Sequence, residues 1–265
     1  MIVTILGSGT STGVPIIQCK CTVCRSRNPK NKRLRASVWI QLRHNGVQKS
    51  LLIDTSTDLR QQALRANIKD VDAVLYTHPH ADHISGIDEL RCYNFWNHKT
   101  IPVYGNAWTC KELVQKFEYI FKPGPVEGGG IPQLALNQFD SSVPALDVAG
   151  VQVIPISVQH GSKECIGYRV GTVAYVTDCS YIPDHSKERL KGLSTLILDC
   201  VRVEKHRTHL NVEEAVALAQ EFGAKQTYLT HLGHDFDHVR WSRKLPKGIA
   251  LAYDGLQIKT KEHSS

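Results

Sequence analysis

The chain of 265 residues is 42% hydrophobic and 22% charged, which is ordinary for a globular protein and long enough to bury a core without disulfides. No run approaches the roughly 18 apolar residues of a membrane span, and the N-terminus lacks the basic and apolar regions of a signal peptide. We therefore expect a cytoplasmic protein with no membrane partner. The net charge of +7 suits an anionic partner, although the basic stretch from Arg25 to Arg35 is better explained as a solvated loop.

The first third of the chain predicts strands and one helix. Apolar runs predict strands at Val3–Leu6, Val38–Leu42, Leu51–Ile53 and Val71–Tyr76. The second and third of these strands flank Asn45-Gly46, a strong turn signal, and should form a hairpin. Asp58–Ala66 is predicted to be a helix with Ser56 or Thr57 as its N-cap.

The rest of the chain continues in the same style. Helical spacing covers Trp108–Phe121, and the Gly- and Pro-rich stretch 123–132 predicts a loop. Further strands are expected at Val151–Ile156, Tyr168–Val170, Val173–Thr177, Leu196–Leu198 and Thr227–Thr230. A helix is expected over Asn211–Phe222, with a capping box from Asn211 and Glu214 and a stop at Gly223. Two mixed halves, each a sheet covered by helices, suggest an α/β protein built as an αββα sandwich, in a single domain spanning residues 1–265. Periodicity alone does not separate this architecture from other α/β folds.

The strongest chemical signal is the motif His78-x-His80-x-Asp82-His83, directly after a predicted buried strand. Imidazole nitrogens and carboxylate oxygens together suit zinc, manganese or iron. Three further polar residues also follow apolar strands, and these are His160, Asp178 and His231. Because open sheets build sites at strand ends, we expect all of these side chains to meet around metal ions.

In this order, the motifs resemble the metal-binding motifs of the metallo-β-lactamase superfamily, and Asp54 resembles the Asp of that family's first motif. The resemblance implies the αββα fold of that family and two divalent ions, Zn, Mn or Fe. It implies one ion held by His78, His80 and His160, and a second held by Asp82, His83 and His231. Asp178 would bridge both ions. The resemblance also implies catalytic roles for Asp82 and for Asp54, the latter by steadying the ligand loop.

The stretch from Leu198-Asp199-Cys200 through His209 to the Glu- and Ala-rich helix resembles the phosphodiesterase branch of the superfamily. That branch includes tRNase Z and the cyclic-ribose phosphodiesterase of the carbon–phosphorus lyase (phosphonate degradation) pathway. The resemblance implies that His209 contacts the phosphate and protonates the leaving oxygen. His206 is a weaker rival for that role, and Arg91 is a candidate phosphate ligand.

Three cysteines lie close together in the motif Cys19-x-Cys21-x-x-Cys24. Three thiolates at this spacing can hold one zinc ion but need a fourth ligand, and free thiols are the alternative reading. The phosphonate-pathway enzyme carries a similar triplet, and its fourth ligand corresponds here to His234. This resemblance implies a structural zinc that pins the N-terminal loop.

Together these features predict a metal-dependent phosphodiesterase acting on small or cyclic phosphate diesters, such as cyclic ribose phosphates or 2′,3′-cyclic nucleotides. A metal-bridging hydroxide would attack phosphorus, with His209 as general acid. The alternatives are a tRNase Z-like nuclease, or a thiolesterase or lactonase on the same fold. A nucleic-acid partner stays open but is not favoured. The tRNase Z alternative is less favoured because its candidate arm, Lys122–Pro132, is short and because the cysteine triplet is absent from that family's usual pattern. The region Arg91–Phe139 is expected to shape the pocket and is a candidate homodimer contact.

Overall fold

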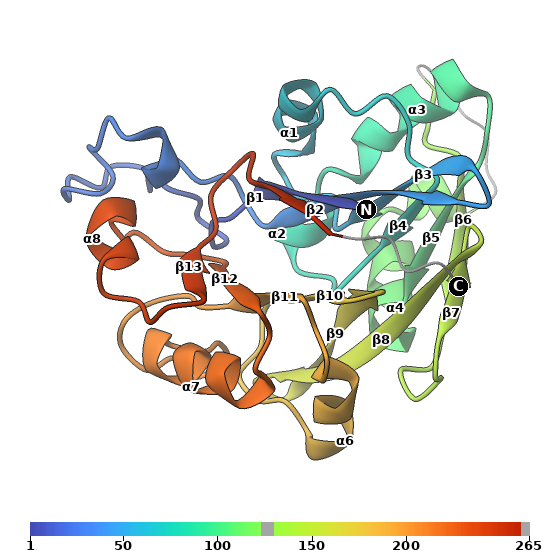
Figure 1. The fold of residues 1–265 in the computed structure, drawn as a ribbon. Helices are drawn as coiled ribbons and strands as arrows, with labels where there is room; N and C mark the ends of the chain where they lie inside the picture. The colour runs from blue at the N-terminus through green and yellow to red at the C-terminus, as the bar shows by residue number, and fades with distance from the viewer. Residues whose placement is uncertain (123–129, 261–265) are drawn as a thin grey trace.

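The apolar runs of the chain become strands of two sheets in this computed structural model, which describes residues 1–122 and 130–260 (Figure 1). In spatial order, the first sheet consists of β14 (Gln257–Lys259), β1 (Ile2–Gly7), β2 (Ser37–His44), β3 (Val47–Ile53), β4 (Ala73–Leu75), β5 (Ile101–Gly105) and β6 (Leu134–Gln138). The second consists of β13 (Ile249–Leu251), β12 (Gln226–Thr230), β11 (Thr195–Asp199), β10 (Val173–Val176), β9 (Lys163–Val170), β8 (Val151–His160) and β7 (Leu146–Val148). The predicted hairpin is confirmed, since β2 and β3 pair antiparallel up to His44 and Val47.

Strand direction decides where the site forms. In the first sheet β3, β4, β5 and β6 are parallel, and in the second β10, β11, β12 and β13 are parallel. Strand β8 is antiparallel to β9, which is antiparallel to β10, so β8 and β10 run in the same direction. The carboxyl ends of these strands therefore share one edge within each sheet, where α/β proteins place their sites.

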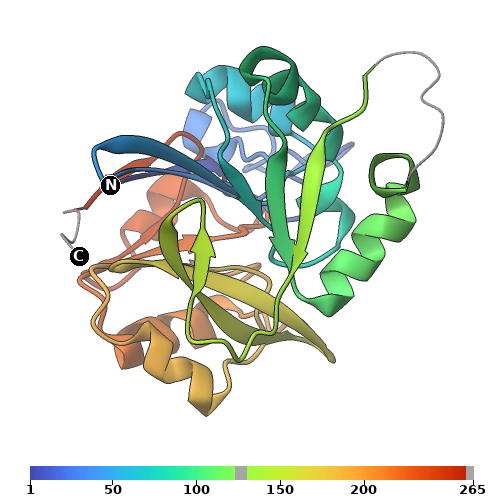
Figure 2. The same ribbon diagram turned by 90° about the vertical axis from the view of Figure 1, so that its right-hand side faces the viewer.

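Helices cover the outer face of each sheet, and the two views of Figures 1 and 2 show the same four layers. The helices on the first sheet are α1 (Leu59–Ala66), α2 (Ala81–Ile84), α3 (Leu90–Asn97), α4 (Ala107–Lys116) and α5 (Glu118–Phe121). Those beside the second sheet are α6 (Asp184–Lys187), α7 (Val212–Phe222) and α8 (His238–Ser242). One apolar cluster lies between the sheets and contains Val38, Ile53, Tyr168 and Ile197. The predicted αββα sandwich is confirmed.

Helix ends follow local hydrogen bonding. The capping box of α7 is present, with Asn211 accepting from the Glu214 amide and Gly223 ending the helix in the left-handed conformation. The predicted N-cap of α1 is wrong, because Asp58 occupies that position and makes no capping bond. Its carboxylate instead accepts hydrogen bonds from the amide and the guanidinium of Arg35. No helix in the described part of the chain is long and apolar enough to cross a membrane.

Several boundaries differ from the sequence prediction. The helix expected over Trp108–Phe121 divides into α4 and α5, because Phe117 leaves helical geometry at φ −123° and ψ 49°. Strand β4 is shorter than the predicted run from 71 to 76. The short strands β5, β6, β7, β13 and β14 were not predicted. Of the predicted loop 123–132, residues 123–129 lie outside the described residues.

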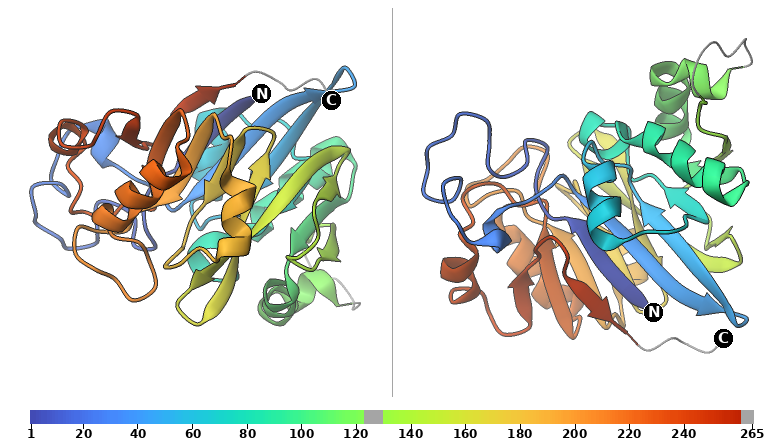
Figure 3. Two further views of the ribbon diagram at one scale, coloured as in Figure 1. Left: turned by 60° about the horizontal axis from the view of Figure 1, so that its bottom comes forward. Right: turned by 90° about the horizontal axis from the view of Figure 1, so that it is seen from above.

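The interpretation of Arg25–Arg35 as a solvated loop is wrong for Arg33, which is only 2% exposed. Its guanidinium donates hydrogen bonds to the carbonyl oxygens of Gly233 and Phe236, at 3.2 and 2.5 Å. Burial lowers the pKa of Arg33 to about 10, although Asp254 and Asp237 nearby favour its charge. Arg33 thus fastens the N-terminal loop to the segment before α8, and these segments lie side by side in both views of Figure 3.

Candidate active site

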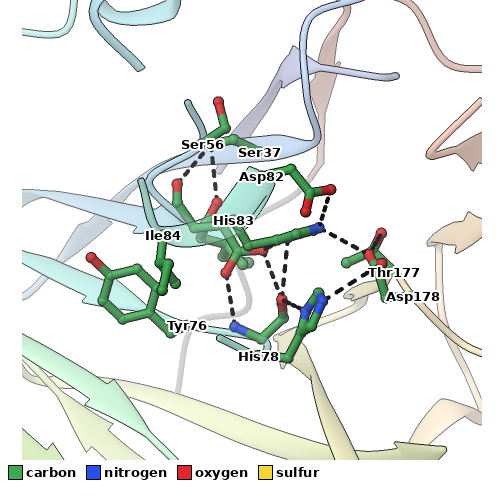
Figure 4. A network of polar contacts seen from close by, with 12 residues as sticks. Ser37, Ser56, Tyr76, His78, Asp82, His83, Ile84, Thr177 and Asp178 are labelled. Carbon is green, nitrogen blue, oxygen red and sulfur yellow. Dashed lines mark hydrogen bonds and ion pairs between the residues drawn. The ribbon is translucent and has the colours of Figure 1, made fainter. Parts of the chain in front are cut away.

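The predicted ligands do converge, although they come from both sheets. Residues His78 and His80 follow β4, Asp82 and His83 lie on α2, His160 ends β8, Asp178 follows β10 and His231 follows β12. Figure 4 shows His78, Asp82 and His83 from the first half of the chain facing Asp178 from the second. The convergence follows from the shared strand edge described above.

Several groups of possible ligand atoms overlap at this edge, and two of them account for six of the predicted ligands; each group has its atoms within 4.8 Å of one another. One group is His78, His80 and His160, and the other is Asp82, His83 and His231. These are the two sets implied by the family resemblance.

Asp178 lies between the two groups. Its Oδ1 is 3.7 Å from Nε2 of His78 and 3.5 Å from Nε2 of His231, and its Oδ2 is 3.2 Å from Nε2 of His83. Burial by itself would raise the pKa of this carboxyl, but the imidazoles of His231, His83 and His78 hold it well below its usual range. An ionised carboxylate that faces both groups is suited to bridge two cations.

The imidazole nitrogens that face this space are near the Asp178 carboxylate but make no hydrogen bond within the described residues. Nε2 of His78, His83 and His231 are buried without a hydrogen bond in the described chain. The Nδ1 atom is engaged in three of the ligand rings. Nδ1 of His78 lies 3.0 Å from the Thr77 hydroxyl, Nδ1 of His160 donates to the Thr208 carbonyl at 2.8 Å, and Nδ1 of His83 donates to Asp54 at 2.7 Å. Buried nitrogens without partners are costly, and a metal ion would satisfy them. The donor set therefore fits divalent ions.

Asp54 sits behind the ligands. It is fully buried, and it accepts hydrogen bonds from the amide and hydroxyl of Thr77 at 2.8 Å each, in addition to His83. Burial raises the pKa of this carboxyl, while His83 and Thr77 oppose the shift. Because Asp54 contacts the residue before His78 as well as the His83 ring, its geometry suits a residue that positions ligands.

Backbone strain marks the site as well. Asp54, Asp178 and His231 have positive φ angles of 63°, 52° and 59°, and each lies just beyond a strand. Such conformations cost about 1 to 3 kcal/mol each in non-glycine residues and persist where the surroundings enforce them. The left-handed turn ends each strand abruptly at the shared edge. No sequence pattern predicted these positive φ angles.

His209 lies beside the ligands, with its ring centroid 4.6 Å from that of His160 and 4.8 Å from that of His231. Its Nε2 is 3.9 Å from Oδ1 of Asp178, and the residue is 9% exposed. Burial lowers its pKa, but the carboxylates of Asp199 and Asp178 outweigh that effect and raise the pKa to about 9. Cations bound at Asp178 would offset part of this rise.

Asp199, which the sequence prediction did not assign a role, organises this side of the site. Its carboxylate lies 3.4 Å from Nδ1 of His209 and 3.6 Å from Nδ1 of His231. It also accepts hydrogen bonds from the amides of Asp178 and Leu210, at 3.1 and 3.0 Å. Its position as the last residue of a buried strand, like the other strand-end residues, was the signal that could have found it.

Two other predicted site residues, His206 as a rival general acid and Arg91 as a phosphate ligand, lie in positions that suit these roles less well. The ring of His206 is 5.0 Å from that of His209, but its Nδ1 faces the backbone amide and hydroxyl of Thr208 at 3.3 Å. Arg91 is exposed on α3 and lines a cavity of about 880 Å³ with Phe95 and Trp96, apart from the predicted ligands. The structure therefore gives no support to Arg91 as a phosphate ligand.

The cysteine triplet meets His234 in a second group of candidate ligands. Nδ1 of His234 lies 3.3, 3.6 and 3.7 Å from Sγ of Cys19, Cys21 and Cys24. A tetrahedral zinc with Zn–S of about 2.3 Å and Zn–N of about 2.0 Å requires about 3.5 Å between sulfur and nitrogen. The backbone amide of Cys24 donates to Sγ of Cys21, which helps to lower the pKa of that thiol to about 7 although burial opposes it. The group fits a zinc ion.

This second group is joined to the active site through the backbone. The amide of Leu232 donates to the Ser8 carbonyl at 2.8 Å, and the amide of Thr10 donates to the Leu232 carbonyl at 3.2 Å. Leu232 directly follows His231 and precedes His234 by two residues. An ion at the cysteines would therefore hold the N-terminal loop against the strand end that carries His231.

Comparison with known proteins identifies the family. A family model described as a β-lactamase superfamily domain matches residues 49–232. The chain belongs to the metallo-β-lactamase superfamily. This superfamily member is similar to a crystal structure of a new diphosphatase from the PhnP family, with 42% identity and a TM-score of 0.88 over 98% of both chains.

Two other relatives are informative. The chain is 37% identical over 255 residues to the octanoyltransferase of Porphyromonas gingivalis, covering 96% of this chain but spanning only 50% of that relative's length. It also resembles Zn²⁺-bound PqqB from Methylobacterium extorquens, with 19% identity and a TM-score of 0.75 over 98% of this chain and 100% of the other. At this level of identity the second likeness shows the fold alone.

Proposed function

We propose that this superfamily member is a metal-dependent phosphodiesterase that hydrolyses small or cyclic phosphate diesters, or the related diphosphate linkage. The observation that carries the proposal is the position of His209. Its Nε2 points toward Asp178, between the two ligand groups, and its Nδ1 is held by Asp199. A phosphodiester has a poor alkoxide leaving group, so it needs a proton donor at this position.

The chain's own residues divide the work. We propose that His78, His80 and His160 hold one ion, that Asp82, His83 and His231 hold the second, and that Asp178 bridges them. When bound, two such ions activate water near neutral pH and neutralise charge on phosphate oxygens. Asp54 keeps the ring of His83 oriented, and Asp199 keeps the proton of His209 on Nε2 for transfer to the leaving oxygen.

His209 also forms a candidate ligand group with His160 and Asp178. We favour the acid role because each ion already has three other side chains and a share of Asp178. An imidazole that is 3.9 Å from the bridging carboxylate is close enough to reach a substrate oxygen bound there. The similar diphosphatase supports the proposal, because its substrate class is also a phosphate linkage.

We further propose zinc at Cys19, Cys21, Cys24 and His234, because soft thiolates favour zinc, and zinc, manganese or iron at the histidine and carboxylate ligands. The eight cysteines are free in the structure, which fits a reducing compartment, and we propose the cytoplasm. The homodimer contact through residues 91–139 stays a prediction.

The octanoyltransferase relative favours a thiolesterase as second candidate, and a substrate panel separates the two. Metal-reconstituted protein would be assayed on bis-p-nitrophenyl phosphate, 2′,3′-cyclic AMP, a precursor tRNA and the octanoyl thioester of N-acetylcysteamine. We expect hydrolysis of the small phosphodiesters that EDTA abolishes and added metal restores. Turnover of the thioester without turnover of any phosphodiester would overturn the proposal, and cleavage of the tRNA alone would support the nuclease alternative.

A further inference from the structure

A tryptophan stands at the edge of the active site without belonging to the core. Trp108 is in the first turn of α4, partly buried, and belongs to none of the apolar clusters of the described residues. Its ring centroid lies 6.5 Å from that of His78 and 6.1 Å from that of His80. A large aromatic ring placed beside candidate metal ligands, rather than in a core, calls for a functional explanation.

The helix that carries Trp108 is anchored at both of its ends. Lys116, also on α4, donates a hydrogen bond to the carbonyl of Pro79 at 2.8 Å, which ties the helix to the ligand loop. Asn106, the N-cap of α4, donates to Glu164 of β9 at 3.2 Å. The helix that carries Trp108 is thus anchored both to the loop of His78 and His80 and to the second sheet.

A cation completes the arrangement. Lys163 is the first residue of β9 and pairs with His160 across the hairpin from β8. Its Nζ lies 5.6 Å from the centre of the Trp108 ring, within the range of a cation–π contact. The side chain is exposed, so the ammonium group is accessible to an anionic ligand at the mouth of the site.

We propose that Trp108 and Lys163 form a substrate subsite, with the ring stacking on a nucleobase and the ammonium group binding an additional phosphate. This inference rests on the proposed function and names its substrate class, a nucleotide-type phosphodiester or diphosphate. Trp108 neighbours His78 and His80, whereas His209 neighbours His160 and His231. The nucleoside is therefore assigned to the part of the substrate that stays on phosphorus, away from the leaving group that His209 protonates.

The stacking role is tested with two esters that share a leaving group. Thymidine 5′-(p-nitrophenyl phosphate) carries a base, and methyl p-nitrophenyl phosphate does not. In Trp108→Leu we expect the ratio of kcat/KM for the thymidine ester to that for the methyl ester to fall about 10-fold, because base stacking on an aromatic side chain contributes at this level. Trp108→Phe should restore most of the ratio, and the exposed Trp96, on α3, provides the control Trp96→Leu. A ratio unchanged in Trp108→Leu would overturn the subsite, whether both rates fall together or neither changes.

The phosphate role is tested by binding, which does not depend on turnover. Calorimetry on metal-loaded protein would compare thymidine 5′-diphosphate with thymidine 5′-monophosphate. Lys163→Gln should remove a preference for the diphosphate of about 5-fold, whereas Lys247→Gln, before β13 at the opposite end of the parallel strands, should keep it. A wild-type protein that binds both nucleotides but hydrolyses neither ester would refute the proposed function and leave the subsite standing. Binding of neither nucleotide, alongside hydrolysis of the methyl ester, would refute the subsite alone.

Discussion

The carboxylate of Asp199 should set the pH at which the enzyme loses activity on the alkaline side. Its charge is the main favourable influence on the protonated His209 ring, whose pKa rises from 6.5 to about 9 despite burial. A rise of this size corresponds to about 3 kcal/mol of favourable interaction with the imidazolium. Asp199→Asn keeps an oxygen that can accept from the Leu210 amide but removes the charge.

The direction in which the pH profile shifts follows from the role of His209 as general acid. A general acid works when protonated, so the rate falls as the pH rises through its pKa. Loss of a carboxylate at 3.4 Å should lower the pKa of His209 by about 1 to 2 pH units, so the alkaline limb should move by that amount to lower pH. Bound metal ions affect the pKa of His209 in the wild-type protein and in Asp199→Asn alike. The difference between the pH profiles of these two proteins is therefore the quantity that tests the reasoning.

The assay is the pH dependence of kcat on a phosphodiester with an alkyl leaving group, whose departure needs the proton. Metal content is measured in parallel, because Asp199 also lies 3.6 Å from His231. Asp254→Asn is the matched control, since Asp254 is a largely buried carboxylate that accepts from Ser8 and Leu34 away from the ligands. That control should lower thermal stability without moving the limb. An alkaline limb that stays in place or moves to higher pH in Asp199→Asn would refute the account of His209.

Three further substitutions test other parts of the site. His209→Ala should lower kcat about 10²- to 10⁴-fold on diesters with an alkyl leaving group, whose departure needs the proton, but far less on p-nitrophenyl esters. Metal content should be unchanged, and equal losses on both kinds of ester would contradict the acid role. Cys24→Ser should remove one zinc ion per chain and lower Tm by about 3 to 8 °C. Cys92 is exposed, so the control Cys92→Ser should change neither zinc content nor Tm. Elemental analysis and thermal unfolding measure the two quantities. Asp54→Ala should weaken active-site metal binding about 10- to 100-fold by freeing the ring of His83, and competition with a chelator would measure this; unchanged affinity would remove its positioning role.

Much of the candidate site could be predicted from the sequence, because only a few residue types bind metal ions. The spacing from His78 to His83, with His160, Asp178 and His231 beyond later strands, is uncommon by chance and predicted a metal site. The division of these residues into two ligand groups, which the structure also shows, was implied by the family resemblance. The capping box of α7 was readable for a similar reason, since Asn211 and Glu214 act over three residues. Such local patterns need no knowledge of distant contacts.

Other features had no local signal. The burial of Arg33 depends on carbonyl groups about 200 residues away, and the break at Phe117 interrupts a regular helical pattern. The sequence indicated only that Asp199 follows a buried strand. The fold shows that its carboxylate lies against His209 and His231. These outcomes depend on which segments pack together, and sequence spacing does not contain that information.

The sequence by itself determined that the chain is an α/β protein and which side chains are suited to bind metal ions, because hydrophobic periodicity and side-chain chemistry are local properties. The choice of the αββα sandwich among α/β folds rested on the resemblance of the metal-binding motifs to those of the family. Only the tertiary structure decided the distances at which the strand ends of the two sheets meet, and with them that Asp199 lies against His209 and His231. It also decided that Trp108, on helix α4, and Lys163, on strand β9 of the second sheet, meet beside His78 and His80. The physical reason is that burial of two apolar sheet faces against each other sets the distances between residues that are far apart in the chain.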